Sequence, residues 1–433
     1  MSKTYALRRV TRSEVIEQDP QRRSRPRINV TRNRKVVALS LFGAVMVVAT
    51  VSTASALVGH HQAISPMFSR ATVSQTGSWT VPADEVDAPA VPTPGGAEAG
   101  TGAFNAVTCA TSDDCVAVGG DANLGGIAAT SSDGGNTWTS ASVESGQPEL
   151  NAVTCSGISD CVAVGVGDAA TSSDGGATWT SVTIPTSNTT LLGVSCPASS
   201  LCVAVGVTPV EAGPYAGDLL VSSDGGSTWT EPQLPPHLGA LGSVDCPSEN
   251  FCVAVGAEIL VSTDGGQSWS PEFIDGGTGV LRNVSCASAT ECVAIGPNGQ
   301  GAGDSTASAF AVTTTNGGEK WTSSTMPPSS YTLNAVSCAP DGSCVASGPG
   351  PGTSAPEATS TDGGVTWQDT TSLPASVSAV AKISCLSSTS CVFVGLEGPT
   401  AVTGTTTDGS TWSVQPVTTI DTTTSTTQTG VAQ

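Results

Sequence analysis

Short apolar runs alternate with turn residues along most of this chain. One stretch shows the order that recurs: "LNAVTC" (150–155), "CVAVG" (161–165), "AATSS" (169–173) and "ATWTSVTI" (177–184). Each run is rich in Val, Thr or Trp and is bounded by Gly, Asp or Ser, which is typical of β-strands. The run "CVAVG" has no polar position on either face, so we expect this strand to be covered on both sides by neighbouring sheets.

A short motif keeps the same order in seven places. "TSSDGGATWT" (171–180) returns as "TSSDGGNTWT" (130–139), "VSSDGGSTWT" (221–230), "VSTDGGQSWS" (261–270), "TTTNGGEKWT" (313–322), "TSTDGGVTWQ" (359–368) and "TTTDGSTWS" (405–413). The steps between the Asp or Asn positions are 41, 50, 40, 52, 46 and 46 residues. Repeats of this size indicate a propeller or a solenoid. Four strands in each of seven repeats, without a helical period, predict an all-β fold. We expect a seven-bladed β-propeller of four-stranded blades over residues 103–416; a β-solenoid is the alternative, although its repeats are usually shorter.

The repeated residues fit a structural role better than a catalytic one. The two glycines supply the positive φ of a tight hairpin turn, and the Asp carboxylate accepts hydrogen bonds across that turn. The Trp ring is expected to lie against the next sheet. Asn316 lacks a charge and the box of Asp408 is one residue short, changes that a catalytic carboxylate would not tolerate. The structural set is Asp133, Asp174, Asp224, Asp264, Asn316, Asp362 and Asp408, with Trp138, Trp179, Trp229, Trp269, Trp321, Trp367 and Trp412.

The pattern Ser/Thr-x-Asp-x-Gly-x-Thr-Trp resembles the Asp-box, or bacterial neuraminidase repeat. That repeat occurs in sialidases, the sortilin luminal domain, xyloglucanase-type glycosidases and photosystem II assembly factor propellers. The resemblance covers about 315 of 433 residues and implies that each box joins the third and fourth strands of a blade, on the outer rim. A sialidase needs three arginines around the substrate carboxylate and a Tyr nucleophile. The propeller region offers Arg282 alone, with Tyr215 or Tyr331 as nucleophile, so sialidase activity is excluded.

The 14 cysteines all fall in local pairs with five residues between the two members. Metal ligands usually cluster as Cys-x-x-Cys, and His60, His61 and His237 do not accompany these pairs, so no metal site is expected. Seven disulfides imply an oxidising compartment, outside the cytoplasm. The expected pairs are Cys109–Cys115, Cys155–Cys161, Cys196–Cys202, Cys246–Cys252, Cys286–Cys292, Cys338–Cys344 and Cys385–Cys391.

The N-terminal region agrees with export. Residues 1–35 carry a net charge of +8 and precede the uncharged, largely apolar residues 36–58. This pattern predicts a basic cytoplasmic tail and a single transmembrane helix that anchors the rest outside. The alternative is a cleaved signal peptide, with "ASA" (54–56) as the cleavage site and a secreted product. The Gly, Ala, Thr and Val content fits a bacterium.

Two further segments flank the predicted propeller. Residues 59–102, rich in Pro, Ala and Gly, are expected to form an extended stalk, and residues 417–433 a disordered Thr-rich tail. The stretch "GSWTV" (77–81), with Trp79, resembles a fourth strand without its box. It either pairs with the propeller edge or lies in the stalk.

Charge narrows the range of partners. Beyond residue 58, 33 acids accompany four bases, a formal charge of −29, which argues against binding of nucleic acid. Acidic loops can attract calcium, but the chain has no Asp-x-Asp-x-Asp-Gly loop, and no cofactor is expected.

Strand alternation predicts where a ligand binds. The disulfide hairpins and the boxes must share one face, while the loops between strands two and three and between blades share the other. Longer insertions fall on that second face, at 207–218, 297–308, 348–358 and 119–126, so we expect a non-enzymatic propeller that binds a protein or glycan there. The candidate ligand-binding residues are Glu211, Tyr215, Asp218, Phe273, Asp275, Asp304, Tyr331 and Glu357, together with Arg282.

Arg282 stands at the innermost-strand position that holds Asn105, Asn151 and Asn334 in other repeats. It is therefore expected to point into the central channel, as a lone cation in an acidic field. The alternative function is a glycoside hydrolase, which needs two carboxylates about 5–10 Å apart and sugar-stacking aromatic rings. Aromatic residues outside the boxes are scarce, and no catalytic residue is assigned.

Overall fold

The computed structural model describes residues 102–417, apart from 122, 187, 210–214, 237, 276–279, 298–308, 328–332 and 351–353. The expected N-terminal tail, membrane helix, stalk, Trp79 strand and C-terminal tail fall in residues 1–101 and 418–433, outside the described part. Within the described part, no helix has the length and apolar character needed to span a bilayer.

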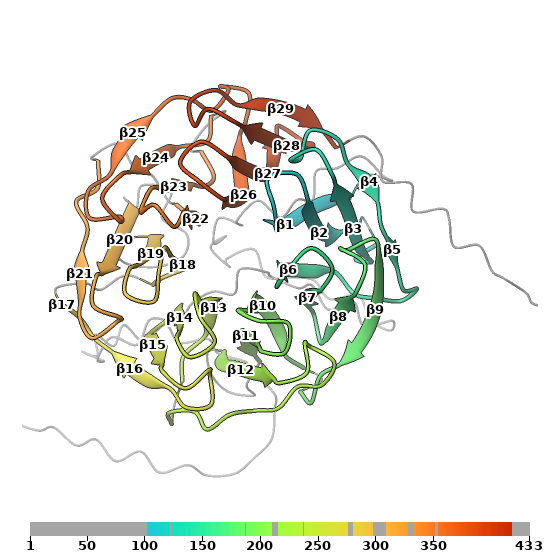
Figure 1. Cartoon of the computed structure of the whole chain (residues 1–433), viewed down its shortest axis with the longest axis vertical. Coiled ribbons are helices and arrows are strands. Elements are labelled where there is room, and N and C mark those ends of the chain that lie inside the picture. The colour runs from blue at the N-terminus through green and yellow to red at the C-terminus, as the bar shows by residue number, and fades with distance from the viewer. Residues whose placement is uncertain are drawn as a thin grey trace, which may run out of the picture. The chain divides into compact units, whose positions relative to one another are not determined.

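Seven sheets radiate from a central channel, with each blade running outwards from its first strand (Figure 1). This confirms the predicted seven-bladed all-β propeller. Blades 1 to 4 are β1 (Ala103–Cys109), β2 (Cys115–Gly120), β3 (Gly126–Ser131) and β4 (Thr139–Ser140); β6 (Leu150–Cys155), β7 (Cys161–Gly165), β8 (Asp168–Ser172) and β9 (Thr178–Thr183); β10 (Thr190–Ser195), β11 (Cys202–Thr208) and β12 (Ala216–Ser222); and β13 (Leu241–Asp245), β14 (Cys252–Gly256), β15 (Ile259–Ser262) and β16 (Ser270–Glu272).

Blades 5 to 7 repeat the arrangement. They are β18 (Asn283–Cys286), β19 (Cys292–Pro297), β20 (Ala309–Thr314) and β21 (Trp321–Ser323); β22 (Ala335–Cys338), β23 (Cys344–Ser347), β24 (Glu357–Ser360) and β25 (Gln368–Thr370); and β26 (Ala379–Cys385), β27 (Cys391–Glu397), β28 (Thr400–Thr406) and β29 (Ser413–Pro416). The short strands β5 (Ser142–Val143) and β17 (Ile274–Asp275) join blades 2 and 5 from the preceding blade. In blade 3 the fourth strand is reduced to a bridge between Val221 and Thr230.

The Asp-boxes close the turn between strands three and four. In blade 2, the Ser172 hydroxyl donates to Asp174 Oδ1 at 2.8 Å, while Thr178 donates its N–H to Oδ1 at 2.9 Å and its hydroxyl to Oδ2 at 2.6 Å. Asn316 keeps the Oδ1 contacts, accepting from the Thr314 hydroxyl at 2.9 Å and the Lys320 N–H at 3.1 Å. These contacts confirm the turn-closing role of the box.

The boxes and the disulfides lie on one face, as the strand alternation predicts. All seven expected disulfides form, each in the hairpin between strands one and two. The first box glycine then bonds to that hairpin: the Gly175 N–H donates to the Ser159 carbonyl at 2.8 Å. We call this side the box face and the opposite side the insertion face.

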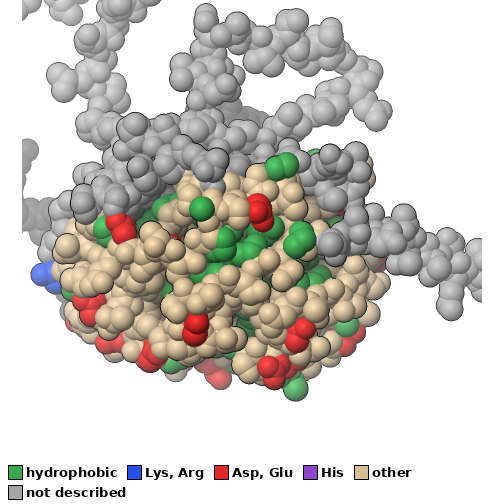
Figure 2. All heavy atoms as spheres, turned by 90° about the horizontal axis from the view of Figure 1, so that it is seen from above, with side chains coloured by type: hydrophobic (Ala, Val, Ile, Leu, Met, Phe, Trp, Pro, Cys, Tyr) green, Lys and Arg blue, Asp and Glu red, His purple; other side chains and the backbone are tan. Residues whose placement is uncertain are grey.

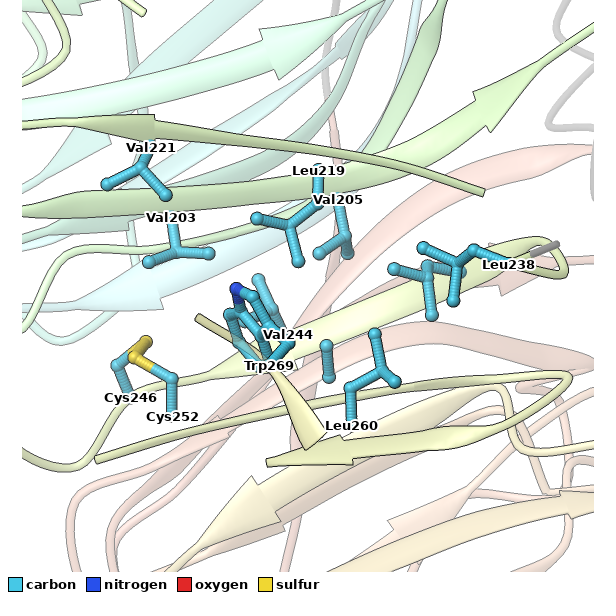
Figure 3. Close-up of a cluster of buried hydrophobic side chains, with 12 residues drawn as sticks. Val203, Val205, Leu219, Val221, Leu238, Val244, Cys246, Cys252, Leu260 and Trp269 are labelled. Carbon is cyan, nitrogen blue, oxygen red and sulfur yellow. A yellow bond between two sulfur atoms is a disulfide. The ribbon is translucent and has the colours of Figure 1, made fainter. Parts of the chain in front are cut away.

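Each box Trp packs between two blades. Figure 3 shows Trp269 of blade 4 facing Val203, Leu219 and Val221 of blade 3, with Leu260 of its own blade beneath. The Trp ring therefore covers the preceding sheet, and the expectation that it covers the next sheet is wrong. The reason is that the turn into strand four carries the ring onto the side of the sheet that faces the preceding blade.

A second apolar position completes each of these interfaces. Six residues that lie five positions after a box Trp, and one that lies six positions after, pack into the cluster of the next blade's Trp. We call them the outer belt: Val143, Ile184, Leu234, Ile274, Met326, Leu373 and Val417. Parallel bridges hold the belt in place, such as Gln233 with Ser268 and Thr325 with Thr366.

Within residues 102–417 as described, the ring closes without a sheet shared by its two ends. The four strands of blade 7 all come from residues 379–416, and the four strands of blade 1 all come from residues 103–140. Among the described residues, blades 7 and 1 are joined by packing of β1 against β26 and β27 and by a hydrogen bond from the Thr405 hydroxyl to Asn136 Oδ1 at 3.2 Å. Val417 packs into the cluster of blades 1 and 7, which includes Phe104 and Trp138.

Candidate functional site

The innermost strands surround a cavity of about 160 Å³ in the central channel, which we call the channel pocket. Its polar lining includes Asn105, Asn151, Arg282, Asn283, Asn334 and Lys382. Each innermost strand begins at the insertion face and runs towards its disulfide on the box face. Asn105, Asn151 and Arg282 lie within two residues of the start of these strands and therefore near the insertion face.

The local backbone explains why these side chains line the pocket. In β1 and β6 the register shifts between residues 104 and 106 and between residues 150 and 152, so Asn105 and Asn151 fall out of the ladder at a bulge. Each amide then bonds to the next blade: Asn105 Nδ2 donates to the Leu150 carbonyl at 3.0 Å, and Asn151 Nδ2 donates to the Leu191 carbonyl at 2.9 Å.

Arg282 lines this pocket, as its position in the repeat predicts. Its Nη1 donates to Asn334 Oδ1, in the next blade, at 2.8 Å. Burial lowers the pKa of the Arg282 guanidinium from its ordinary value, and no charge among the described residues contributes to that shift. Arg282 is thus a half-buried, partly desolvated cation whose described partner is a neutral amide.

A second cation in the pocket was not anticipated, so Arg282 is not the lone cation there. Lys382, from β26 in blade 7, reaches across the channel to Asn283 in blade 5. With the Asn283 amide oriented so that its oxygen accepts and its nitrogen donates to the Val336 carbonyl, Lys382 Nζ lies 2.8 Å from the amide oxygen. Asp245 of blade 4 stabilises the charge of Lys382 electrostatically, although burial lowers the pKa of the Lys382 amine. Burial likewise raises the pKa of Asp245 to about 6, against the opposing effects of the Cys286 N–H and Lys382.

Asp245 replaces a hydroxyl residue that joins neighbouring blades elsewhere. Its Oδ2 accepts the Cys286 N–H of blade 5 at 2.7 Å. In three other blades a serine at this position makes the same bond. The N–H of Cys246 donates to Ser195 at 3.0 Å, and the N–H groups of Cys338 and Cys385 donate to Ser285 and Ser337 at 2.9 Å. The sequence carries a signal for this pair. Asp245 stands one residue before a Cys, where other repeats have Ser or Thr, and Lys382 stands at the repeat position that holds Ala106 or Ala152 in other repeats.

Two predicted ligand-binding carboxylates have their partners inside the blades. Asp218 accepts the Leu219 N–H at 2.9 Å and the hydroxyls of Thr189 and Thr208. Glu357 accepts the Ser372 hydroxyl at 2.6 Å and its N–H at 3.1 Å, as well as the Trp412 indole N–H at 3.1 Å. Both side chains are buried, so we set them aside from the site and assign them a structural role.

The other predicted residues do not gather at one place in the described part. Tyr215 is half-buried just before β12, while Phe273 is 88% exposed on the outer rim between β16 and β17. Glu211, Asp304, Tyr331 and the side chain of Asp275 lie outside the described residues.

Acidic side chains surround the pocket on the insertion face. We call the acidic rim a set of exposed or half-buried acids at strand ends, turns and connections of that face: Asp121, Glu149, Asp168, Glu258 and Glu397. Figure 2 shows acidic groups spread over the visible described surface, with little basic surface between them. The pocket differs from this rim because its described lining holds Arg282 and Lys382 but no carboxylate.

This lining offers little to a glycoside hydrolase. Two carboxylates must flank the scissile bond in such an enzyme, and aromatic rings usually stack on the sugar. The described lining of the channel pocket has no Asp or Glu, and its one aromatic ring, Phe104, is 3% exposed. No group of His, Cys, Asp or Glu in the described part is placed to hold a metal ion. The pocket's chemistry suits the binding of an anion.

Comparison with known families supports the assignment of the repeat. The family model of the BNR/Asp-box repeat matches residues 260–271, which include the box of blade 4. The chain is a seven-bladed propeller with Asp-box repeats. No curated protein matches this chain.

Two solved structures with TM-scores of at least 0.50 share the propeller fold. The GH74 xyloglucanase from Xanthomonas campestris is 13% identical, over 73% of this chain and 54% of that chain, with a TM-score of 0.53. The RRP9 WD40 repeats are 9% identical, over 68% and 87%, with a TM-score of 0.50. YCF48 bound to D1 peptide is 22% identical, over 60% and 79%, with a TM-score of 0.45. Identities this low concern the fold alone.

Proposed function

We propose that this chain is a non-enzymatic binding propeller that holds a protein partner on the insertion face, at the mouth of the channel pocket. The observation that carries the proposal is Arg282, a half-buried, partly desolvated cation in a pocket whose described lining has no carboxylate. Withdrawing a charge from water without an ionic partner among the described residues costs free energy, and such groups occur where a ligand supplies the missing charge.

The size of the pocket favours a partner that inserts one group. Sites for whole small molecules usually measure about 300–1,000 Å³. The channel pocket, at about 160 Å³, suits part of a larger ligand whose remaining surface rests on the surrounding loops. A protein meets this condition, and a glycan is the alternative ligand.

The proposal includes export from the cytoplasm. Disulfides persist in oxidising compartments, and every cysteine of this chain lies in a disulfide. The basic segment and the apolar segment at residues 1–58 support a membrane anchor that displays the propeller outside.

The test compares two matched substitutions in the full-length chain. Ala381 is an exposed pocket-lining residue of β26, and Ala177 is exposed in the box turn of blade 2. Capture from labelled surface proteins, and binding to a glycan array, are measured for the wild-type chain, Ala381→Trp and Ala177→Trp. We expect Ala381→Trp to weaken capture of a specific protein at least tenfold, and Ala177→Trp to leave it unchanged. Loss in Ala177→Trp with retention in Ala381→Trp would place the ligand on the wrong face and refute the proposal.

A further inference from the structure

The unused donors of Arg282 indicate what the partner inserts. A guanidinium has five N–H donors in a planar fork, and the described contacts of Arg282 use one, on Nη1. The group that best matches the remaining fork is a carboxylate, which accepts two parallel hydrogen bonds.

Lys382 does not compete for this role. With the Asn283 amide oriented to accept, the Lys382 amine bonds to its oxygen, and the negative charge of Asp245 offsets the charge of Lys382. Arg282 therefore carries the net positive charge of the pocket, and one carboxylate would neutralise it. Asn105 and Asn151, whose amide nitrogens are already bonded, fix the adjacent wall.

The acidic rim sets the character of the rest of the ligand. A carboxylate that approaches the pocket passes Glu149, whose Oε1 accepts from Asn105 Nδ2 at 2.9 Å, and the other acids of the rim. An acidic partner would be repelled on approach, whereas basic residues around one carboxylate would be attracted. The small pocket volume favours a narrow chain end over a folded loop.

We infer that the channel pocket binds the C-terminal carboxylate of a polypeptide whose preceding residues are basic, with Arg282 as the carboxylate-binding residue. The carboxylate pairs with the guanidinium, and the basic residues contact the acidic rim. This inference rests on the proposed function, since it specifies the group that enters the pocket.

The experiment uses the full-length chain and two series of synthetic peptides. The probes are Lys/Arg-rich decapeptides with varied last two positions, each made as the free acid and as the C-terminal amide. Binding is measured by fluorescence anisotropy for the wild-type chain, Arg282→Gln and the control Lys320→Gln, which removes a positive charge from the box face. A third series, amidated and ending in Glu, tests a side-chain carboxylate as the source.

We expect some free-acid peptides to bind wild type at least tenfold more tightly than their amides. Arg282→Gln should abolish that difference, and Lys320→Gln should preserve it. Equal binding of acids and amides, an acid preference that survives Arg282→Gln, equal binding of the Glu-ending amides, or no binding in any series would overturn the inference. The proposed function fails separately, if a captured protein is lost in Ala177→Trp and kept in Ala381→Trp.

Discussion

The indole N–H of Trp412, in blade 7, donates a hydrogen bond of 3.1 Å to the carboxylate of Glu357, in blade 6. In the boxes of blades 1, 2, 4 and 6 the Trp donates instead to the carbonyl of its own second glycine, as Trp269 does to Gly266 at 2.9 Å. The last box is one residue shorter and has a single glycine. A buried acid from the preceding blade provides the acceptor in its place.

Glu357 is therefore expected to stabilise the fold. Glu357→Ala leaves the N–H groups of Ser372, Leu373 and Trp412 without this acceptor, and we expect the free energy of unfolding to fall by about 3 kcal/mol. Chemical denaturation of the full-length chain measures the change. Glu258→Ala, an exposed acid of blade 4, serves as control and should stay within about 0.5 kcal/mol of wild type. An unchanged stability in Glu357→Ala would show that water replaces the carboxylate.

Asp245 should make stability depend on pH. Because the pKa of Asp245 is raised to about 6 in the folded chain, the folded state binds more protons than the unfolded state between about pH 4 and 6. The contribution of Asp245 to the free energy of unfolding therefore decreases as pH rises through that window. Asp245→Asn removes the charge. The difference in unfolding free energy between this variant and wild type should therefore shift in favour of the variant by up to roughly 3 kcal/mol as pH rises from 4 to 8.

Unfolding curves at pH 4, 5, 6, 7 and 8 for wild type and Asp245→Asn measure this gain. Glu231→Gln, an exposed acid, provides the control, and its difference from wild type should not vary over the same range. If Asp245→Asn instead loses stability above pH 6, the attraction between Asp245 and Lys382 outweighs the cost of burying the carboxylate.

Val417 is expected to hold the seam between blades 7 and 1. The residue is half-buried against the cluster that contains Phe104 and Trp138, at the one junction where the two chain ends of the ring meet. A charge there loses the apolar contact and is desolvated, so Val417→Asp should cost about 2 kcal/mol of unfolding free energy. Val365→Asp, in a box turn where the side chain is 41% exposed, should cost far less. Equal effects in the two variants would mean that the belt residue does not close the ring.

The box carboxylates should contribute as hydrogen-bond acceptors more than as charges. The Thr178 side chain and N–H hold the pKa of Asp174 below its ordinary value, so its contribution is present above that value and is lost as pH falls through the folded pKa. Asp174→Asn keeps Oδ1, as Asn316 does, and should cost less than Asp174→Ala, for which we expect about 1–2 kcal/mol at pH 7. Thermal unfolding of the two variants ranks them, and a larger loss in Asp174→Asn would assign the main role to the charge.

The blade count, the disulfides and the shared face could be predicted because each depends on contacts within one repeat. Cys155 and Cys161, or Ser172 and Asp174, are close in the chain, and their spacing recurs seven times. The outer belt also has a periodic signal, an apolar residue five or six positions after each box Trp, which sequence reasoning missed.

Contacts between blades could not be predicted from the sequence in the same way. Glu357 looked like an exposed loop acid because its partner Trp412 is 55 residues away, in the next blade. Lys382 and Asp245 interact electrostatically from blades 7 and 4, which are distant in sequence, so no local pattern joins them. Arg282 could be placed in the channel from the sequence because residues at its position in other repeats, such as Asn105, Asn151 and Asn334, also line the channel pocket.

In the proposed function, the ligand occupies the insertion face. The most direct test is hydrogen–deuterium exchange of the full-length chain with and without the captured partner, comparing the turns of the two faces. We predict slower exchange in the insertion-face turns at 119–126 and 255–260 and unchanged exchange in the box turns at 172–178 and 222–228. Protection confined to the box turns would contradict the account.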